Sequence, residues 1–237
     1  MRRIGHKGAD HIAPGNTLAS FDSALEHRCD MIEFDVLPED LEDREGGRLV
    51  LAHDPGDAAR RDPITLEEGL DHFLTEAYAG IELDVDLKLP GYEARVVAAL
   101  RDRGLATRTL ISTMEPESLR AVRALAPEIR LGWSVPKVKR DYLASRVTRP
   151  LAYAGIGVLR RQLPGQAARA IREGRVDALM AHWAVVTPRL AAAVRDAGGE
   201  LYVWTVDEAP RIAALEAMGV AGVITNDPRL FAPRPVS

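Results

Sequence analysis

Short apolar runs of the kind that form buried β-strands alternate with amphipathic helical patterns along most of the chain. We expect eight strands, over residues 3–6, 30–36, 80–87, 108–112, 129–134, 177–182, 201–205 and 222–225. Apolar residues recur with helical spacing between these runs, as in the helix expected over 17–27, with Leu18, Phe21, Ala24 and Leu25. Strands that alternate with helices through short connections are typical of parallel β/α folds.

Proline and glycine mark the ends of the other expected helices. These helices are predicted over 66–77, 116–125, 188–197 and 209–218. A proline stands at or beside the start of three of them, where its missing amide hydrogen costs nothing: Pro116, Pro188 and Pro210. Glycines follow expected helices where a left-handed residue is wanted: Gly104, Gly198 and Gly219.

The polar residues within the strands decide between a closed (β/α)₈ barrel and an open doubly wound sheet. Strands of an open parallel sheet are buried on both faces and form continuous apolar runs. Here Glu33 and Asp35 share one face of the second expected strand, because side chains alternate along a strand. Asp84, Asp86 and Lys88 likewise share one face of the third. Barrel active sites lie at the carboxyl ends of such strands, so we predict an α/β TIM barrel.

Two segments depart from the regular alternation. Residues 135–176 carry helical patterns near 138–160 and 164–174, and we expect them to form extra helices at one rim. The acidic segment 38–48 precedes the apolar run 49–52 and is expected to form a hairpin-like loop. With no internal repeat or linker, the sequence predicts one domain over 1–237, without a sizeable insertion domain.

Composition narrows the possible partners. The chain has 237 residues, 46% of them hydrophobic, which suits one barrel domain. Its net charge of -4 gives no basic surface for nucleic acid. A lone Cys29 excludes an internal disulfide framework and fits a reducing compartment. No apolar region follows Met1-Arg2-Arg3 and no run of 18 apolar residues occurs, so we expect neither a cleavable signal nor a membrane span. We therefore expect a cytoplasmic protein with a small-molecule substrate. The sequence does not determine its oligomeric state.

Two histidines stand where a pair for proton transfer is needed. His6 ends the first expected strand, and His53 follows the apolar run 49–52. Histidine titrates near neutral pH and can serve as the acid in one step and the base in another. His182 ends the sixth expected strand and could reach the same rim, or pack there structurally.

Glu33, Asp35 and Asp86 offer hard oxygen ligands of the kind that bind Mg²⁺ or Ca²⁺. No Cys/His spacing indicates a structural zinc site. The alternative is that these acids form salt bridges inside the barrel with Lys7 and Lys88. Taken together, carboxylates, lysines and histidines suit a phosphoester site, where cations bind anionic oxygens and histidines move protons.

Several short motifs follow one another along nearly the whole chain. They are His6-Lys7-Gly8, Pro14-Gly15-Asn16-Thr17, Glu33-Phe34-Asp35-Val36, His53-Asp54, Asp86-Leu87-Lys88, Trp204-Thr205-Val206-Asp207 and Thr225-Asn226-Asp227-Pro228. In this order the set resembles the glycerophosphodiester phosphodiesterase family. A compact barrel is also similar to sphingomyelinase-D-like phospholipases. Two features fit the phosphodiesterases better: the number of residues between His6 and Glu33, and the Trp-Thr-Val-Asp motif.

The resemblance implies hydrolysis of a glycerophosphodiester to an alcohol and glycerol 3-phosphate. It implies that His6 and His53 are catalytic, in an order left open, and that water or a substrate hydroxyl attacks. The residues that would hold the metal are Glu33, Asp35 and Asp86. The residues that would contact the substrate are Lys7, Lys88 and Trp204, the last as a wall for the alcohol.

Several positions depart from the family pattern. Lys7 replaces an arginine, Gly15 a glutamate, and the shorter Asp86 another glutamate. The segment between His53 and Asp86 leaves little room for the insertion domain that many members carry there. Two alternatives therefore stay open: a sphingomyelinase-D-like lysophospholipase D, and a non-catalytic barrel that binds phosphoesters.

Overall fold

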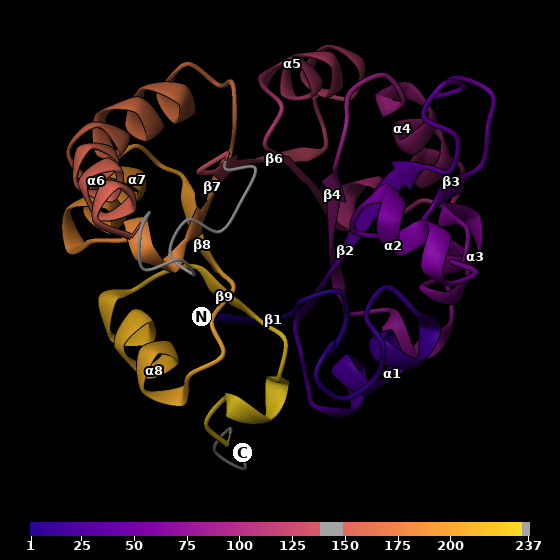
Figure 1. Ribbon diagram of the computed structural model, residues 1–237, viewed down its shortest axis with the longest axis horizontal. Helices are drawn as coiled ribbons and strands as arrows, with labels where there is room; N and C mark the ends of the chain where they lie inside the picture. The colour runs from indigo at the N-terminus through magenta and orange to yellow at the C-terminus, as the bar shows by residue number, and fades with distance from the viewer. Residues whose placement is uncertain (138–148, 234–237) are drawn as a thin grey trace.

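Eight parallel strands close into a barrel in the computed structural model, which describes residues 1–137 and 149–233, with only the backbone for 149–154 (Figure 1). Strand β1 pairs with β2 on one side and with β9 on the other, which closes the sheet. The barrel strands are β1 (Arg2–Gly5), β2 (Met31–Pro38), β4 (Glu82–Leu87), β5 (Thr109–Thr113), β6 (Arg130–Val135), β7 (Ala178–His182), β8 (Glu200–Trp204) and β9 (Gly222–Thr225). All eight predicted strands are confirmed, as is the closed barrel.

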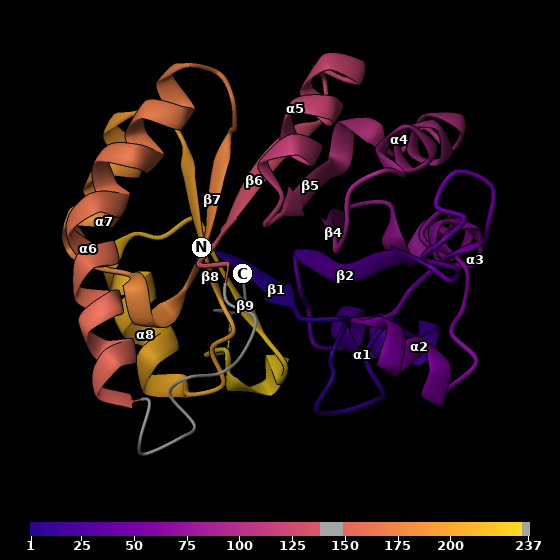
Figure 2. The ribbon, with the colours of Figure 1, turned by 45° about the horizontal axis from the view of Figure 1, so that its top comes forward.

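Helices surround the barrel on its outer face (Figure 2). They are α1 (Leu18–Glu26), α2 (Pro55–Arg60), α3 (Leu66–His72), α4 (Glu93–Asp102), α5 (Pro116–Leu125), α6 (Arg149–Arg172), α7 (Pro188–Asp196) and α8 (Ala209–Met218). Four short 3₁₀ helices, η1 to η4, span Glu76–Tyr78, Ala106–Arg108, Trp183–Val185 and Pro228–Leu230. None of the helices in the described ranges is both long and apolar enough to cross a membrane.

The local signals for helix ends hold in the structure. Thr17 caps α1, where its side chain accepts a hydrogen bond from the Ser20 amide. Helices α5 and α8 have the predicted bounds. Gly219 ends α8 with φ +79°, a conformation that glycine adopts without strain. The predicted helix over 66–77 is divided into α3 and η1.

The two irregular segments have different outcomes. Strand β3 (Leu49–Val50) pairs antiparallel with the end of β2, so the predicted hairpin around residues 38–48 is confirmed. Between β6 and β7, the prediction of two separate helices is wrong for the described part. One helix, α6, runs through Pro164, and it packs outside the barrel against α7. Residues 138–148 of the first expected helix lie outside the described residues.

Side chains fill the barrel interior in layers contributed by alternate strands. At the amino ends of the strands, two arginines and two glutamates form a ring of ion pairs: Arg2, Glu82, Arg130 and Glu200. An apolar cluster lies next to it, contributed by neighbouring as well as alternate strands: Ile4, Met31, Leu110, Ala178, Met180, Tyr202 and Ile224. The acidic residues of β2 and β4 lie toward the carboxyl ends. The candidate site therefore has a closed, apolar floor.

Candidate active site

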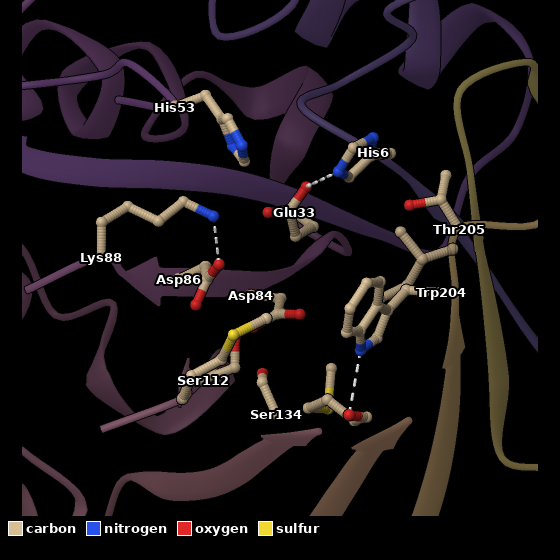
Figure 3. Close-up of a pocket in the computed structure, with 13 residues that line it drawn as sticks. His6, Glu33, His53, Asp84, Asp86, Lys88, Ser112, Ser134, Trp204 and Thr205 are labelled. Atoms are coloured by element: carbon tan, nitrogen blue, oxygen red, sulfur yellow. Dashed lines mark hydrogen bonds and ion pairs between the residues drawn. The ribbon is translucent and has the colours of Figure 1, made fainter. Parts of the chain in front are cut away.

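A cavity of about 170 Å³ opens at the carboxyl ends of the barrel strands (Figure 3). Both sequence-predicted histidines face it, together with acidic residues of β2 and β4 and with Lys88. The lining residues are His6, Glu33, His53, Asp84, Asp86, Lys88, Ser112, Met114, Ser134, Met180, Trp204, Thr205 and Ile224. Most of the predicted site residues therefore lie in one place.

Glu33, Asp35 and Asp86 converge as the sequence predicted. Each offers one carboxylate oxygen, and these oxygens lie within 4.8 Å of one another. The convergence follows from strand register, because Asp35 of β2 lies beside Asp86 of β4 and Glu33 is two residues earlier on the same face. Asp35 is fully buried and Glu33 is 5% exposed. Such a cluster of hard oxygen ligands can hold a divalent cation.

Lys88 is the cation closest to this cluster in the structure. Its ammonium group forms ion pairs with Asp35 Oδ1 and Asp86 Oδ2. Burial opposes the charge on Asp35, but Lys88 and His53 outweigh it and hold the pKa of Asp35 well below its usual range. Burial and the Asp35 charge together raise the pKa of Glu33 well above its usual range. The site therefore has more negative charge than Lys88 alone can balance.

The two histidines lie on either side of Glu33 (Figure 3). His6 Nε2 is 3.9 Å from Glu33 Oε2. His53 Nδ1 is 3.3 Å from Asp35 Oδ2, and its side chain is half exposed on the loop between β3 and α2. Burial lowers the pKa of His6 to about 4, so this ring is neutral near pH 7. The two rings thus face one cavity from different environments.

The turn after β1 contains two of the departures from the family pattern, Lys7 and Gly15. The Lys7 ammonium is 2.9 Å from Asp10 Oδ2, so its side chain is directed at Asp10, whereas its backbone amide donates to Glu33 Oε2 at 2.8 Å. The predicted phosphate contact of the Lys7 side chain would require its ammonium to leave Asp10. A Cβ on Gly15 would lie 2.9 Å from the Lys7 Cβ and 2.6 Å from Asp10 Oδ1. A larger residue at position 15 would need this turn to shift.

Trp204 forms one wall of the cavity. Its indole Nε1 donates to the Met180 carbonyl oxygen at 2.9 Å. The His182 ring packs edge-on against this indole, with centroids 5.1 Å apart, and its Nδ1 accepts from the Ala184 amide. His182 therefore reaches the rim, as the sequence allowed, and there it supports Trp204.

Sequence reasoning missed two polar groups at the site as functional candidates. Asn16 Nδ2 donates to Asp35 Oδ2 at 2.9 Å, and Asn16 Oδ1 accepts from the Asp35 amide at 3.0 Å. Asp84 is fully buried, and within the described ranges its carboxyl oxygens form no hydrogen bond of good geometry, although the Ser112 hydroxyl lies nearby and favours the charged form. Burial raises the pKa of Asp84 to about 8. Strand alternation had already placed Asp84 beside Asp86, whereas nothing in the sequence indicated the contact of Asn16.

Comparison with known proteins supports one family. The family model described as the glycerophosphoryl diester phosphodiesterase family matches residues 6–56 and 39–230. A glycerophosphodiester phosphodiesterase of Caldanaerobacter subterraneus subsp. tengcongensis is 27% identical over 261 residues, which cover 95% of this chain and 93% of the relative. A putative glycerophosphodiester phosphodiesterase of Bacillus subtilis is also 27% identical, over 96% of this chain and 95% of its own length.

Solved structures share the fold. A putative glycerophosphoryl diester phosphodiesterase from Silicibacter pomeroyi superposes with a TM-score of 0.75 at 19% identity, over 97% of this chain and 91% of that one. A phosphodiesterase from Oleispira antarctica, solved in complex with the product sn-glycerol-3-phosphate, gives a TM-score of 0.67 at 19% identity, with 97% and 94% covered. Because the family model spans nearly the whole barrel, the chain belongs to the glycerophosphoryl diester phosphodiesterase family.

Proposed function

We propose that this protein hydrolyses glycerophosphodiesters to an alcohol and glycerol 3-phosphate. The observation that carries the proposal is the placement of His6 and His53 on either side of Glu33, above the cluster of three carboxylates. The names of the relatives agree with this reaction, and the Oleispira antarctica protein is described with sn-glycerol-3-phosphate as its product. The described single barrel would contain the whole site.

The two histidines would move the protons of the reaction. One would take a proton from the attacking hydroxyl, and the other would give a proton to the leaving alkoxide. His6 and His53 are suited to this division because they contact different carboxylates, Glu33 and Asp35. Their rings reach the cavity from separate segments, the end of β1 and the loop before α2.

Glu33, Asp35 and Asp86 would hold a divalent cation, Mg²⁺ or Ca²⁺. The residues fit such an ion, because three carboxylates supply hard oxygen ligands within reach of one another, and burial together with the Asp35 charge raises the pKa of Glu33. When bound, the cation would supply positive charge to the non-bridging oxygens of the phosphate. Within the described part of the chain, no other cluster of metal-ligating side chains is found.

Lys88 and Trp204 would contact the substrate. The Lys88 ammonium faces the cavity from β4 and would add positive charge beside the phosphate. Trp204 would form the wall against the alcohol portion, because its indole is already fixed by the bond to Met180. Lys7 would reach the phosphate only if its ammonium left Asp10.

Turnover of a chromogenic aryl phosphodiester, measured with and without chelator, tests the proposal against the non-catalytic alternative. We expect cation-dependent release of the aryl alcohol and its loss in the His6→Ala variant. A panel of glycerophosphocholine, glycerophosphoethanolamine and a lysophospholipid then separates this activity from a lysophospholipase D. Release of glycerol 3-phosphate from the first two supports the proposal, and cleavage of the lysophospholipid alone contradicts it.

A further inference from the structure

A chain of short hydrogen bonds holds the face of His6 that points away from Glu33. His6 Nδ1 lies 2.6 Å from Asn226 Oδ1. The other end of the same amide, Asn226 Nδ2, donates to Asp207 Oδ2 at 2.7 Å. The three residues follow the ends of β1, β9 and β8, which are neighbours in the barrel.

Asp207 is anchored independently of His6. Its Oδ1 accepts hydrogen bonds from Thr225 Oγ1 and from the Asn226 backbone amide, both at 2.9 Å. The backbone nearby is also fixed, because the His6 amide donates to the Thr225 carbonyl oxygen at 2.8 Å. The carboxylate therefore has a set position, to which the Asn226 side chain adjusts.

The chemistry of these groups leaves one arrangement of protons. An ionised carboxylate can only accept hydrogen bonds, so the NH₂ end of the Asn226 amide must face Asp207. The carbonyl end then faces His6 and can only accept, so His6 Nδ1 must carry the proton. In a neutral imidazole the other nitrogen then bears the lone pair. That nitrogen, Nε2, is the one on the side of Glu33.

We propose that Asp207 and Asn226 are positioning residues that hold His6 in the Nδ1–H tautomer, which makes its Nε2 the proton acceptor of the reaction. This inference rests on the proposed function and assigns its roles. His6 Nε2 takes the proton of the attacking hydroxyl as the new P–O bond forms. The P–O bond to the alcohol breaks, and His53 gives its proton to the leaving alkoxide. The protons balance, because one histidine gains what the other loses, and exchange with water restores both.

Asp207 makes the sharpest test, because it touches Asn226 and not His6. In the Asp207→Ala variant the amide is free to turn its NH₂ end toward His6. The ring would then adopt the Nε2–H tautomer, which has no lone pair facing the cavity. We expect ¹⁵N spectra of histidine-labelled protein to show the Nδ1–H form of His6 in the wild type and its loss in this variant. Turnover should fall roughly 10²–10⁴-fold, with little change in KM.

Two further variants separate the tautomer from general damage to the loop. Thr225→Val removes the hydrogen bond from Thr225 Oγ1 to Asp207 but leaves the Asn226 side chain between Asp207 and His6. His6 should therefore keep the Nδ1–H form. The double exchange Asp207→Asn with Asn226→Asp places a carboxylate beside His6 and an amide behind it. This arrangement still accepts the Nδ1 proton, so it should restore both the tautomer and most of the turnover.

An Nε2–H form in the wild type, or an unchanged Nδ1–H form in Asp207→Ala, would overturn the inference. Failure of the double exchange to recover the Nδ1–H form would also contradict it. The spectra need no turnover, so an inactive wild type with the Nδ1–H tautomer would refute the proposed function and leave the tautomer assignment intact.

Discussion

The buried carboxyl of Asp84 should make the protein less stable as the pH rises. This side chain is fully buried, and none of its contacts in the described part of the chain is a hydrogen bond of good geometry; the nearby Ser112 hydroxyl favours its charged form, but burial outweighs that effect. Burial raises its pKa from 3.8 to about 8. When folding raises the pKa of a carboxyl, the protein is most stable below the pKa of the unfolded chain, where the group is protonated in both states. Its unfolding free energy then falls as the pH rises from the unfolded pKa to the folded pKa. The loss therefore falls between about pH 4 and pH 8.

The size of this effect follows from the shift in pKa. Each pH unit between the two pKa values costs about 1.4 kcal/mol, so the loss from pH 5 to pH 8 is roughly 4 kcal/mol. That is a large share of the roughly 5–15 kcal/mol typical of folded domains. The Asp84→Asn variant has no group to ionise at this position. Its unfolding free energy, relative to wild type, should therefore rise by roughly 4 kcal/mol between these pH values.

Urea unfolding of both proteins at pH 5, 6, 7 and 8, with chelator present, measures this difference. Asp196→Asn serves as the matched control, because the Asp196 side chain is 64% exposed, and it should show no such trend. The reasoning about Asp84 is wrong if the Asp84→Asn difference is the same at pH 5 and pH 8. That result would mean that the carboxyl is ionised in the folded protein at both pH values, as it is in the unfolded chain.

Three further predictions concern catalysis. Alanine at His6 or His53 should lower turnover of an aryl phosphodiester roughly 10²–10⁴-fold, and a near-wild-type rate for His6→Ala with metal bound would exclude its role. Exhaustive chelation should abolish activity, and Mg²⁺ or Ca²⁺ should restore it, whereas full activity without a cation would remove the metal from the mechanism. Among glycerophosphodiesters, kcat/KM should vary modestly, because the short segment 55–81 leaves the cavity open beside β2 and β4; a preference of several orders of magnitude would indicate a closing element.

The sequence predicted the barrel well because its signals are local and periodic. Alternation along β2 and β4 places their acidic residues on one face, and the closed barrel turns that face inward. The proline at the start of α5 and the glycine after α8 mark their ends for reasons that need no tertiary contact. These features could be inferred from the chain alone.

The features that the sequence did not predict are ones for which local chemistry allows more than one outcome. The resemblance implies that the Lys7 side chain contacts the substrate phosphate, whereas the structure places its ammonium with Asp10. The Asn16 contact with Asp35 joins a turn after β1 to β2. The sequence predicted separate helices near 138–160 and 164–174, yet α6 continues through Pro164 in the described part of this segment. In each case the spacing of residues is compatible with more than one set of contacts.

The two ends of the barrel show why a cation is expected at one of them. At the amino ends, two arginines and two glutamates pair with one another, so the ring carries no net charge: Arg2, Glu82, Arg130 and Glu200. At the carboxyl ends, Lys88 faces Glu33, Asp35 and Asp86, while Lys7 is paired with Asp10. Buried carboxylates that lack a counter-charge are costly. Ion pairing neutralises the ring at the amino ends, but at the carboxyl ends it leaves negative charge on the carboxylates. A divalent cation bound among these carboxylates would supply the missing positive charge.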